Sequence, residues 1–281
     1  MRIAFLGTGL LGAGFVRHLL ATTGTVTVWN RTAAKAAPLA EAGARIAASV
    51  AEAAAGADRI HLCVKDDAAV DAILAEALPA LPPGAVVLDH TTTSIVGSRA
   101  RAARLAAAGV GFLHAPVFMS PAAAASAKGI MLCAGPADVY AQVDAALAAM
   151  TGDLWYVGDD HGRAAAMKLS GNAMLIAITA GMADALAVGR AGGLTGGDVF
   201  DVMARLKPGG AIELRGKKMA AGDFTASFEL TMARKDLGLM IAAVDGAPLA
   251  ALAAIAARAD QLIAAGHGAD DMGVLGLPPS A

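Results

Sequence analysis

The chain has 281 residues, of which 57% are hydrophobic, with 22 Lys and Arg balanced by 24 Asp and Glu. This length is typical of two domains, and the low charge argues against disorder. No basic stripe is present, so nucleic acid is not an expected partner.

Neither an export signal nor a membrane span is expected. The first residues are interrupted by glycines and lack a cleavage signature. The apolar stretch from Ala173 to Val188 contains Asp184, and we interpret it as a buried helix rather than a membrane span. Cys63 and Cys133 form no metal or redox motif, which indicates buried, reduced thiols. We therefore expect a cytoplasmic protein with no membrane partner.

Short β-rich runs alternate with alanine-rich helical runs in the first half of the chain. The pattern predicts strands at Arg2–Leu6, Thr25–Trp29, Arg59–Val64, Ala85–Asp89 and Phe112–Val117, with further candidates at Ile130–Cys133 and Leu154–Val157. Helices are expected between them at Leu10–Ala21, Asp67–Ala80 and Ser94–Ala108. Such alternation predicts an α/β domain over residues 1–160, with a doubly wound parallel sheet covered by helices on both faces.

Strand signals stop after Asp159, and the second half has a helical pattern. One proline-free helix is predicted at about residues 163–191, with others at Thr195–Leu206, Phe228–Val244 and Pro248–Ala264. We expect an all-α C-terminal domain over residues 161–281, entered through this long interdomain helix and ending in a mobile tail after Gly266.

A glycine-rich turn follows the first predicted strand. It reads Gly7-Thr8-Gly9-Leu10-Leu11-Gly12 and opens a helix. Gly7 suits a tight turn, Gly9 lets a pyrophosphate approach the backbone, and Gly12 permits close packing of helix and strand. In this context the motif predicts a Rossmann dinucleotide-binding domain, with the phosphates at the helix N-terminus.

The end of the second predicted strand indicates which dinucleotide binds. An NAD site places a carboxylate there for the ribose 2′-hydroxyl, but this strand ends in Asn30, Arg31 and Thr32, with Lys35 one turn later. Arg31 can pair with a 2′-phosphate, while Asn30 and Thr32 offer hydrogen bonds. The sequence therefore predicts NADP(H) as cofactor.

Lys168 and Asn172 lie four residues apart inside the long predicted helix. They share one helix face, and a lysine on an apolar helix needs water, a partner or a site. Burial can lower the pKa of such a lysine and suit it to proton transfer, although a snorkelling surface lysine would show the same pattern.

Several motifs in order resemble the β-hydroxyacid dehydrogenases, which include 3-hydroxyisobutyrate dehydrogenase and tartronate semialdehyde reductase. The resemblance rests on the glycine turn, on Asp89-His90-Thr91-Thr92-Thr93-Ser94, on Ala115-Pro116-Val117, on Gly129 through Gly135, on Lys168 with Asn172, and on Phe228 leading to Lys235-Asp236-Leu237. It covers nearly the whole chain and implies a C-terminal domain like that of 6-phosphogluconate dehydrogenase.

The resemblance also implies roles for individual residues. Lys168 would be the general acid and base, and Asn172 would position a small-molecule substrate. Thr92 and the loop Val64-Lys65-Asp66 would lie near the nicotinamide, and Lys235 would help to close the cleft over the cofactor. It further implies a homodimer or homotetramer. The histidines show no metal-ligand spacing, so we expect no metal.

The predicted substrate loop departs from the family. Where the family has D-A-P-V-S-G-G, this chain has His114-Ala115 followed by Pro116, Val117, Phe118, Met119 and Ser120. The serine and glycines that would hold a substrate carboxylate are replaced by apolar bulk. The substrate is therefore expected to be larger or less charged than a short hydroxy acid.

Three functions stay open at this point. The leading prediction is an NADP-dependent dehydrogenase or reductase that acts on a small hydroxy acid, aldehyde or keto acid. An imine reductase-like enzyme would suit the apolar loop, but such enzymes typically carry Asp or Tyr at the position of Lys168. A non-catalytic NADP-binding module is the third, although it would not need Lys168, Asn172 and Lys235.

Overall fold

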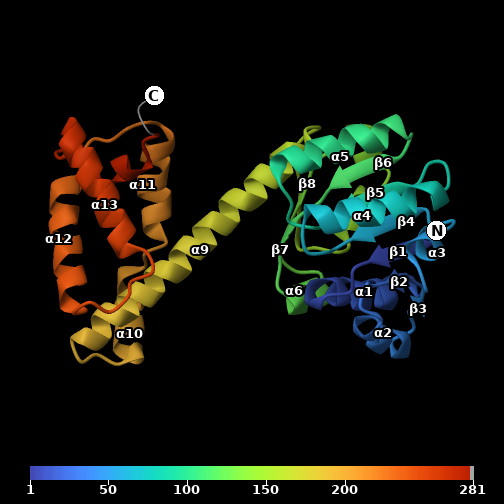
Figure 1. Cartoon of the computed structure of the whole chain (residues 1–281), viewed down its shortest axis with the longest axis horizontal. Helices are drawn as coiled ribbons and strands as arrows, with labels where there is room; N and C mark the ends of the chain where they lie inside the picture. The colour runs from blue at the N-terminus through green and yellow to red at the C-terminus, as the bar shows by residue number, and fades with distance from the viewer. Residues whose placement is uncertain (279–281) are drawn as a thin grey trace. The chain divides into compact units, whose positions relative to one another are not determined.

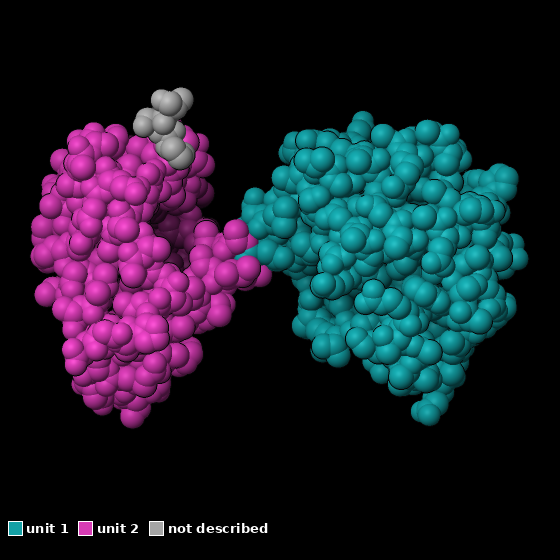
Figure 2. Space-filling model, viewed as in Figure 1, with its two compact units in different colours: residues 1–172 teal, residues 173–281 magenta. Residues whose placement is uncertain are grey.

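The computed structural model describes residues 1–278. Contacts divide the chain into two compact units between Asn172 and Ala173 (Figure 2, teal and magenta). The predicted domain boundary at residue 160 coincides with the start of helix α9 (His161–Ala191), which begins in the first unit and ends in the second (Figure 1).

The first unit contains a six-stranded sheet in the order β3-β2-β1-β4-β5-β6, in which every neighbouring pair is parallel. The strands are β1 (Ile3–Leu6), β2 (Thr27–Trp29), β3 (Arg45–Ile46), β4 (Arg59–Leu62), β5 (Val86–Asp89) and β6 (Gly111–His114). The predicted Rossmann-like fold class is confirmed. Strand order reverses between β1 and β4, and the carboxyl ends of these two strands mark the point where such sheets bind ligands.

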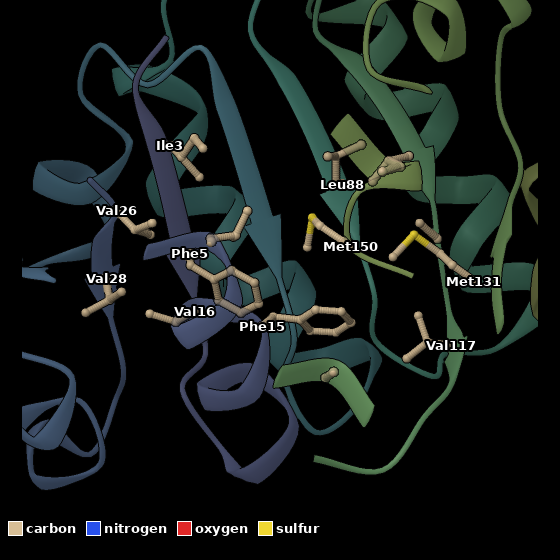
Figure 3. Close-up of a cluster of buried hydrophobic side chains, with 14 of the residues drawn as sticks. Ile3, Phe5, Phe15, Val16, Val26, Val28, Leu88, Val117, Met131 and Met150 are labelled. Carbon is tan, nitrogen blue, oxygen red and sulfur yellow. The ribbon is translucent and has the colours of Figure 1, made fainter. Parts of the chain in front are cut away.

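Helices pack against both faces of this sheet. They are α1 (Leu10–Thr23), α2 (Ala37–Glu41), α3 (Val50–Ala54), α4 (Asp67–Ala77) and α5 (Ile95–Ala107). Successive residues of β1 serve opposite faces: Ile3 and Phe5 pack in one core with Phe15 of α1 (Figure 3), whereas Ala4 and Leu6 pack in the other. Each large buried side chain contributes about 1.5–3 kcal/mol, so β1 is firmly anchored where the glycine turn begins.

A smaller sheet of three strands, β7-β8-β9, adjoins the first. It consists of β7 (Val117–Phe118), β8 (Ile130–Cys133) and β9 (Asp153–Tyr156), with β7 antiparallel to β8 and β8 parallel to β9. The short helices α6 (Pro121–Ala125), α7 (Ala137–Ala141) and α8 (Asp144–Ala148) connect these strands. The single predicted strand Phe112–Val117 is thus two strands, one in each sheet, because the chain leaves the parallel sheet after His114.

The second unit is helical. After α9 come α10 (Gly196–Leu206), α11 (Gly210–Ala220), α12 (Leu230–Ala243) and α13 (Leu252–Leu262). A capping box of Thr195 and Asp198 opens α10. The tail after Gly266 was expected to be mobile, but its described residues 267–278 pack: Asp271 is 3% exposed and accepts hydrogen bonds from Arg215 and Ser227.

The prediction that residues 173–188 form a buried helix is wrong in the structure of the single chain. Leu175 and Ile176 of α9 are 56% and 69% exposed. Helix α9 is long enough to cross a membrane, and the mean hydropathy of its 18-residue apolar window, 1.5, is high enough. Only 6% of that window is buried. Core helices of soluble proteins also meet the length and hydropathy requirements. Asp184, the charge within the stretch, is buried and accepts hydrogen bonds from the backbone N–H groups of Ala250, Ala251 and Leu252, at the start of α13.

Candidate active site

The glycine-rich turn joins β1 to α1 at the reversal of strand order. Gly7 has φ of +102°, and a β-carbon there would overlap the carbonyl of Cys63 at the end of β4. A β-carbon at Gly12 would overlap the carbonyl of Gly7, whereas one at Gly9 would meet no atom within 4 Å. The space at Gly9 and the N-terminus of α1, where this N-cap residue has no side chain, together suit a pyrophosphate.

Asn30 ties the glycine turn to the end of β2. Its carboxamide oxygen accepts a hydrogen bond from the Thr8 N–H at 3.0 Å, and its amide donates to the Thr32 carbonyl at 2.9 Å. Arg31 and Lys35 remain exposed at the cavity wall. The residues Thr27–Lys35 include no carboxylate, so the site fits a 2′-phosphate.

A cavity of about 660 Å³ runs along the carboxyl ends of the strands. Its lining brings together most of the predicted site residues, namely Gly7, Gly9, Leu10, Leu11, Gly12, Asn30, Arg31, Thr32, Lys35, Val64, Lys65, Thr92, Val117, Met119 and Lys168. The cavity thus places Lys168 and the glycine turn on one surface of the first unit, as a redox site for a dinucleotide requires.

Other predicted residues lie outside this lining. Asp66 is the N-cap of α4, accepting from the Ala69 N–H, and the oxygen of Ser120 caps α6 by accepting from the Ala123 N–H. Pro116 is buried, and Phe118 packs against Lys168. Lys235 belongs to the second unit, where it pairs with Asp236 at 2.9 Å.

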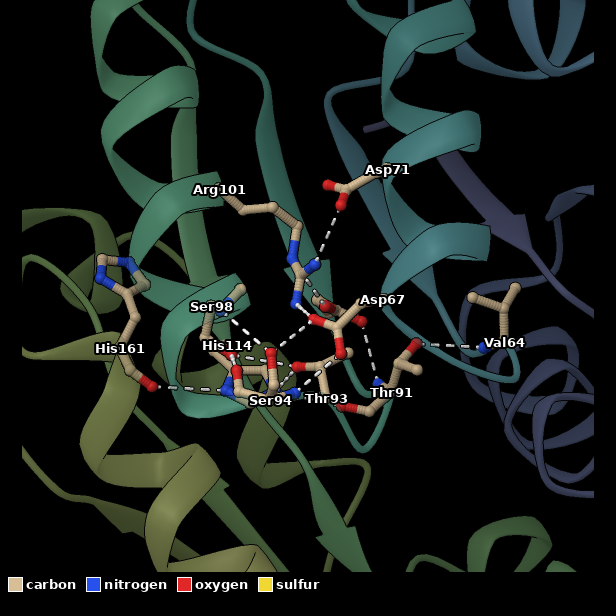
Figure 4. A network of polar contacts seen from close by, with 12 residues as sticks. Val64, Asp67, Asp71, Thr91, Thr93, Ser94, Ser98, Arg101, His114 and His161 are labelled. Atoms are coloured by element: carbon tan, nitrogen blue, oxygen red, sulfur yellow. Dashed lines mark hydrogen bonds and ion pairs between the residues drawn. The ribbon is translucent and has the colours of Figure 1, made fainter.

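A polar network beside the cavity joins the loops after β4 and β5 (Figure 4). Arg101 of α5 is 1% exposed and donates to Asp67 at 2.8 Å, and Asp67 accepts from the backbone N–H and hydroxyl of Ser94. The Val64 N–H donates to the Thr91 hydroxyl at 3.1 Å. These contacts hold together two loops that line the cavity.

Lys168 is 8% exposed, and its ammonium has two contacts. It donates to Asn172 Oδ1 at 2.9 Å and lies 4.1 Å from the centroid of the Phe118 ring. Burial lowers the pKa of Lys168, and burial is the only cause of that shift among the described residues. The alternative of a snorkelling surface lysine is therefore wrong.

A pair of buried histidines below the cavity was not predicted. His90 Nδ1 faces the Ala115 carbonyl at 2.9 Å, so we assign its proton there, and His90 Nε2 then accepts from His61 Nδ1 at 2.9 Å. Burial lowers the pKa of His90 to about 4 and that of His61 well below its usual value. Both rings are therefore neutral at pH 7.

Other lining residues escaped the sequence analysis as well. They are Trp29, Cys63, Ala69, Ala72, Ile73, Glu76 and Thr91. Periodicity places Ile73 and Glu76 on a helix, but only the packing of that helix turns them towards the cavity. His90 and Thr91 lay within a motif already noted, and their place directly after a buried strand was the signal that could have identified them.

Comparisons with known proteins agree with this geometry. The family model for the NAD-binding domain of 6-phosphogluconate dehydrogenase matches residues 2–158. The model described as NAD-binding of NADP-dependent 3-hydroxyisobutyrate dehydrogenase matches residues 162–276. An uncharacterized oxidoreductase of Shewanella frigidimarina is 30% identical over 245 residues, which cover 85% of this chain and 84% of that protein.

Two further relatives have different names. The cytokine-like nuclear factor N-PAC of Homo sapiens is 30% identical over 260 residues, which cover 90% of this chain and 47% of that protein, so the chain spans about half the length of such relatives. A reductive aminase from Aspergillus terreus, solved in complex with NADPH4, cyclohexanone and allyl amine, is 28% identical with a TM-score of 0.87, covering 98% of this chain and 97% of that one.

The fold, the cavity and the family models together define a protein built from the NADP(H)-binding and C-terminal domains of the 3-hydroxyisobutyrate dehydrogenase type. The prediction of NADP(H) as cofactor is confirmed. The chain belongs to the β-hydroxyacid dehydrogenase family, as the resemblance indicated.

Proposed function

We propose that the chain transfers hydride between NADP(H) and a small carbonyl compound or its alcohol, such as an aldehyde, a keto acid or a hydroxy acid, with Lys168 as general acid and base. The observation that supports this most is the position of Lys168, which is nearly buried yet lines the same cavity as the glycine turn. Among the described residues, burial is the cause of the lowered pKa of this ammonium, which suits it to proton transfer.

Reduction of a carbonyl places negative charge on its oxygen as a hydride reaches carbon. NADPH, when bound, supplies that hydride. Lys168 gives a proton to the oxygen, and in oxidation the neutral amine takes the proton back. Asn172 accepts one N–H of Lys168 and thereby orients the others. Burial favours the neutral amine, so the lowered pKa of Lys168 eases release of the proton.

The test replaces the lysine and follows two readouts. We expect Lys168→Ala to lower kcat by about 10²–10⁴-fold, the usual contribution of a positioned acid–base group, with NADPH affinity near that of the wild type. Lys128→Ala, which removes an exposed lysine of the same unit, is the control. A panel of aldehydes, keto acids and hydroxy acids followed by NADPH absorbance provides the substrates, and a fully active Lys168→Ala enzyme would refute the role.

Reduction of C=N bonds is the second candidate. It is supported by the likeness to the reductive aminase and by the apolar residues Val117 and Met119 at the cavity. Turnover of cyclic imines without turnover of any carbonyl compound would favour it.

A non-catalytic NADP-binding module is the third candidate, and NADPH binding without turnover of any panel member would favour that one.

The apolar surface of the second unit supports a proposal about assembly. Apolar side chains of α9, α10 and α11 surround a cavity of about 380 Å³, including Ile178, Phe200 and Met203, and Ile176 nearby on α9 is 69% exposed. We propose that a second copy of the chain covers this surface in a homodimer or homotetramer. Light scattering should give a mass above that of the 27.8 kDa chain, and Ile176→Glu should lower it.

A cytoplasmic location remains a proposal. It is supported by Cys63 and Cys133, both of which are free thiols. Fractionation of cells that make the protein would test it, and recovery in an oxidising compartment would refute it.

A further inference from the structure

Phe118 stands at the sequence position where the family's substrate loop carries a serine, and its ring lies beside Lys168. Phe118 ends β7, and the ring contacts the ammonium from 4.1 Å. Phe118 also packs against a buried cluster that consists of Leu132, Ala134, Val157 and Ala164. The ring is therefore a fixed wall of the Lys168 site.

Helix α9 is shaped to accept this ring. A β-carbon at Gly171, one turn after Lys168, would overlap two edge atoms of Phe118, so a larger residue there would displace the ring. Phe118, Lys168, Gly171 and Asn172 thus form one packed group, which we call the lysine clamp. Within the clamp, the ring takes one side of the ammonium and the Asn172 oxygen takes one N–H, which leaves a single N–H direction of Lys168 for substrate.

The loop of residues 114–120 beside the clamp contains no Lys or Arg that would hold an anion. Val117 and Met119 line the cavity with apolar atoms, and the oxygen of Ser120 is engaged in capping α6. His90 is neutral because burial lowers its pKa to about 4. Lys65 is 85% exposed and already paired with Asp66. A carboxylate here would lose water and would find Lys168 as its cationic partner, and a lysine paired in this way would be a poorer proton donor to the carbonyl.

We propose that Phe118 is a specificity-determining residue that restricts the site to uncharged carbonyl compounds with an apolar substituent and disfavours keto and hydroxy acids. This inference rests on the proposed function of Lys168 and narrows its substrate class. The apolar substituent contacts Met119 and Val117, and the substrate oxygen takes the free N–H of Lys168. The reaction is the one given above: hydride adds to the carbonyl carbon, the C=O π pair becomes an oxygen lone pair, and that oxygen takes the Lys168 proton, which solvent replaces.

The experiment compares two substrates that differ in charge, 4-oxobutanoate and its methyl ester, by kcat/KM with NADPH. We expect the wild type to prefer the ester at least tenfold. Phe118→Ser restores a small hydroxyl residue and should lower this ratio at least fivefold, whereas Phe118→Leu, which keeps apolar bulk, should preserve it. Preference of the wild type for the acid, or an unchanged ratio in Phe118→Ser, would overturn the inference while leaving the proposed function intact.

A second variant tests the same inference if Phe118→Ser fails to fold. Gly171→Ala favours the helix but displaces the ring, so it should lower the ratio in the same direction. Gly216→Ala in α11, where a β-carbon meets no atom within 4 Å, is the matched control and should leave the ratio unchanged. An unchanged ratio in Gly171→Ala would count against Phe118 as the determinant. Turnover of no member of the whole carbonyl panel by a wild type that binds NADPH would remove both this inference and the proposed function.

Discussion

The buried guanidinium of Arg101 offers a sharp test of how the cavity loops are held. Arg101→Met keeps the length of the side chain and removes its charge. Arg101 Nη2 donates to Asp67 at 2.8 Å, while Nη1 lies 3.5 Å from Asp71 and Nε lies 4.0 Å from Asp89. Breaking a fully buried pair destabilises a protein by about 3–5 kcal/mol.

The three carboxylates would respond differently to this loss. The side chains of Asp67 and Asp71 are 36% and 42% exposed and can regain water, whereas Asp89 is fully buried. Burial already raises the pKa of Asp89, so this carboxyl can take up a proton and limit the loss. We therefore expect a decrease of about 2–4 kcal/mol in the free energy of unfolding, somewhat below that of a fully buried pair.

Urea unfolding followed by tryptophan fluorescence measures this effect in the first unit, because both Trp29 and Trp155 lie there. Arg104→Met is the matched control: it removes an arginine of the same helix that pairs with Asp71 at 2.8 Å on the surface, and it should change stability by about 0–1 kcal/mol. Equal losses in the two variants would refute the argument that burial decides the difference. NADPH binding should also weaken in Arg101→Met, because the loops it joins line the cavity.

Three further predictions concern separate parts of the chain. Arg31→Ala should raise the Kd for NADPH by about 10–150-fold, since a charge-assisted hydrogen bond contributes about 1.5–3 kcal/mol, and should leave NADH binding unchanged in the same fluorescence titration. Burial raises the pKa of Asp271, but hydrogen bonds from Ser227, Gly273 and Arg215 outweigh it and hold this pKa well below its usual value. The stability advantage of wild type over Asp271→Asn should therefore be full above about pH 4, the unfolded value, and shrink as pH falls further, as thermal unfolding between pH 7 and pH 2.5 would show. Burial raises the pKa of the Cys63 and Cys133 thiols to about 12, so a thiol reagent at pH 8 should label neither in the folded protein and both after unfolding.

The elements that sequence reasoning placed well have strong local signals. Strand β1, which leads into the glycine turn, is a continuous apolar run, because both faces of a parallel sheet are covered. By contrast, β3 has two exposed residues and no apolar run, so nothing in the sequence marked it. The prediction of a buried helix at residues 173–188 was wrong because apolar composition shows that a surface needs cover, but not that the same chain supplies it.

In the candidate site, too, the sequence predicted some residues and could not predict how others make contact. Arg31 and Asn30 were predicted from their position after a strand, yet the structure shows Asn30 joining Thr8 to Thr32 within the turn. Phe118 was noted as apolar bulk in a loop that usually holds an anion. Its contact with Lys168 could not be predicted, because the two residues come from different elements and meet only through the packing of β7 against α9.

The amino-acid sequence by itself determined the dinucleotide turn, the preference for a 2′-phosphate and the shared face of Lys168 and Asn172. Each of these depends on residues within one or two turns of the chain, where backbone geometry and side-chain chemistry suffice. Only the tertiary structure decided that Lys168 is buried, that Phe118 covers one side of it and that Gly171 makes room for the ring. Those contacts join segments far apart in the chain, and local patterns do not specify how such segments pack.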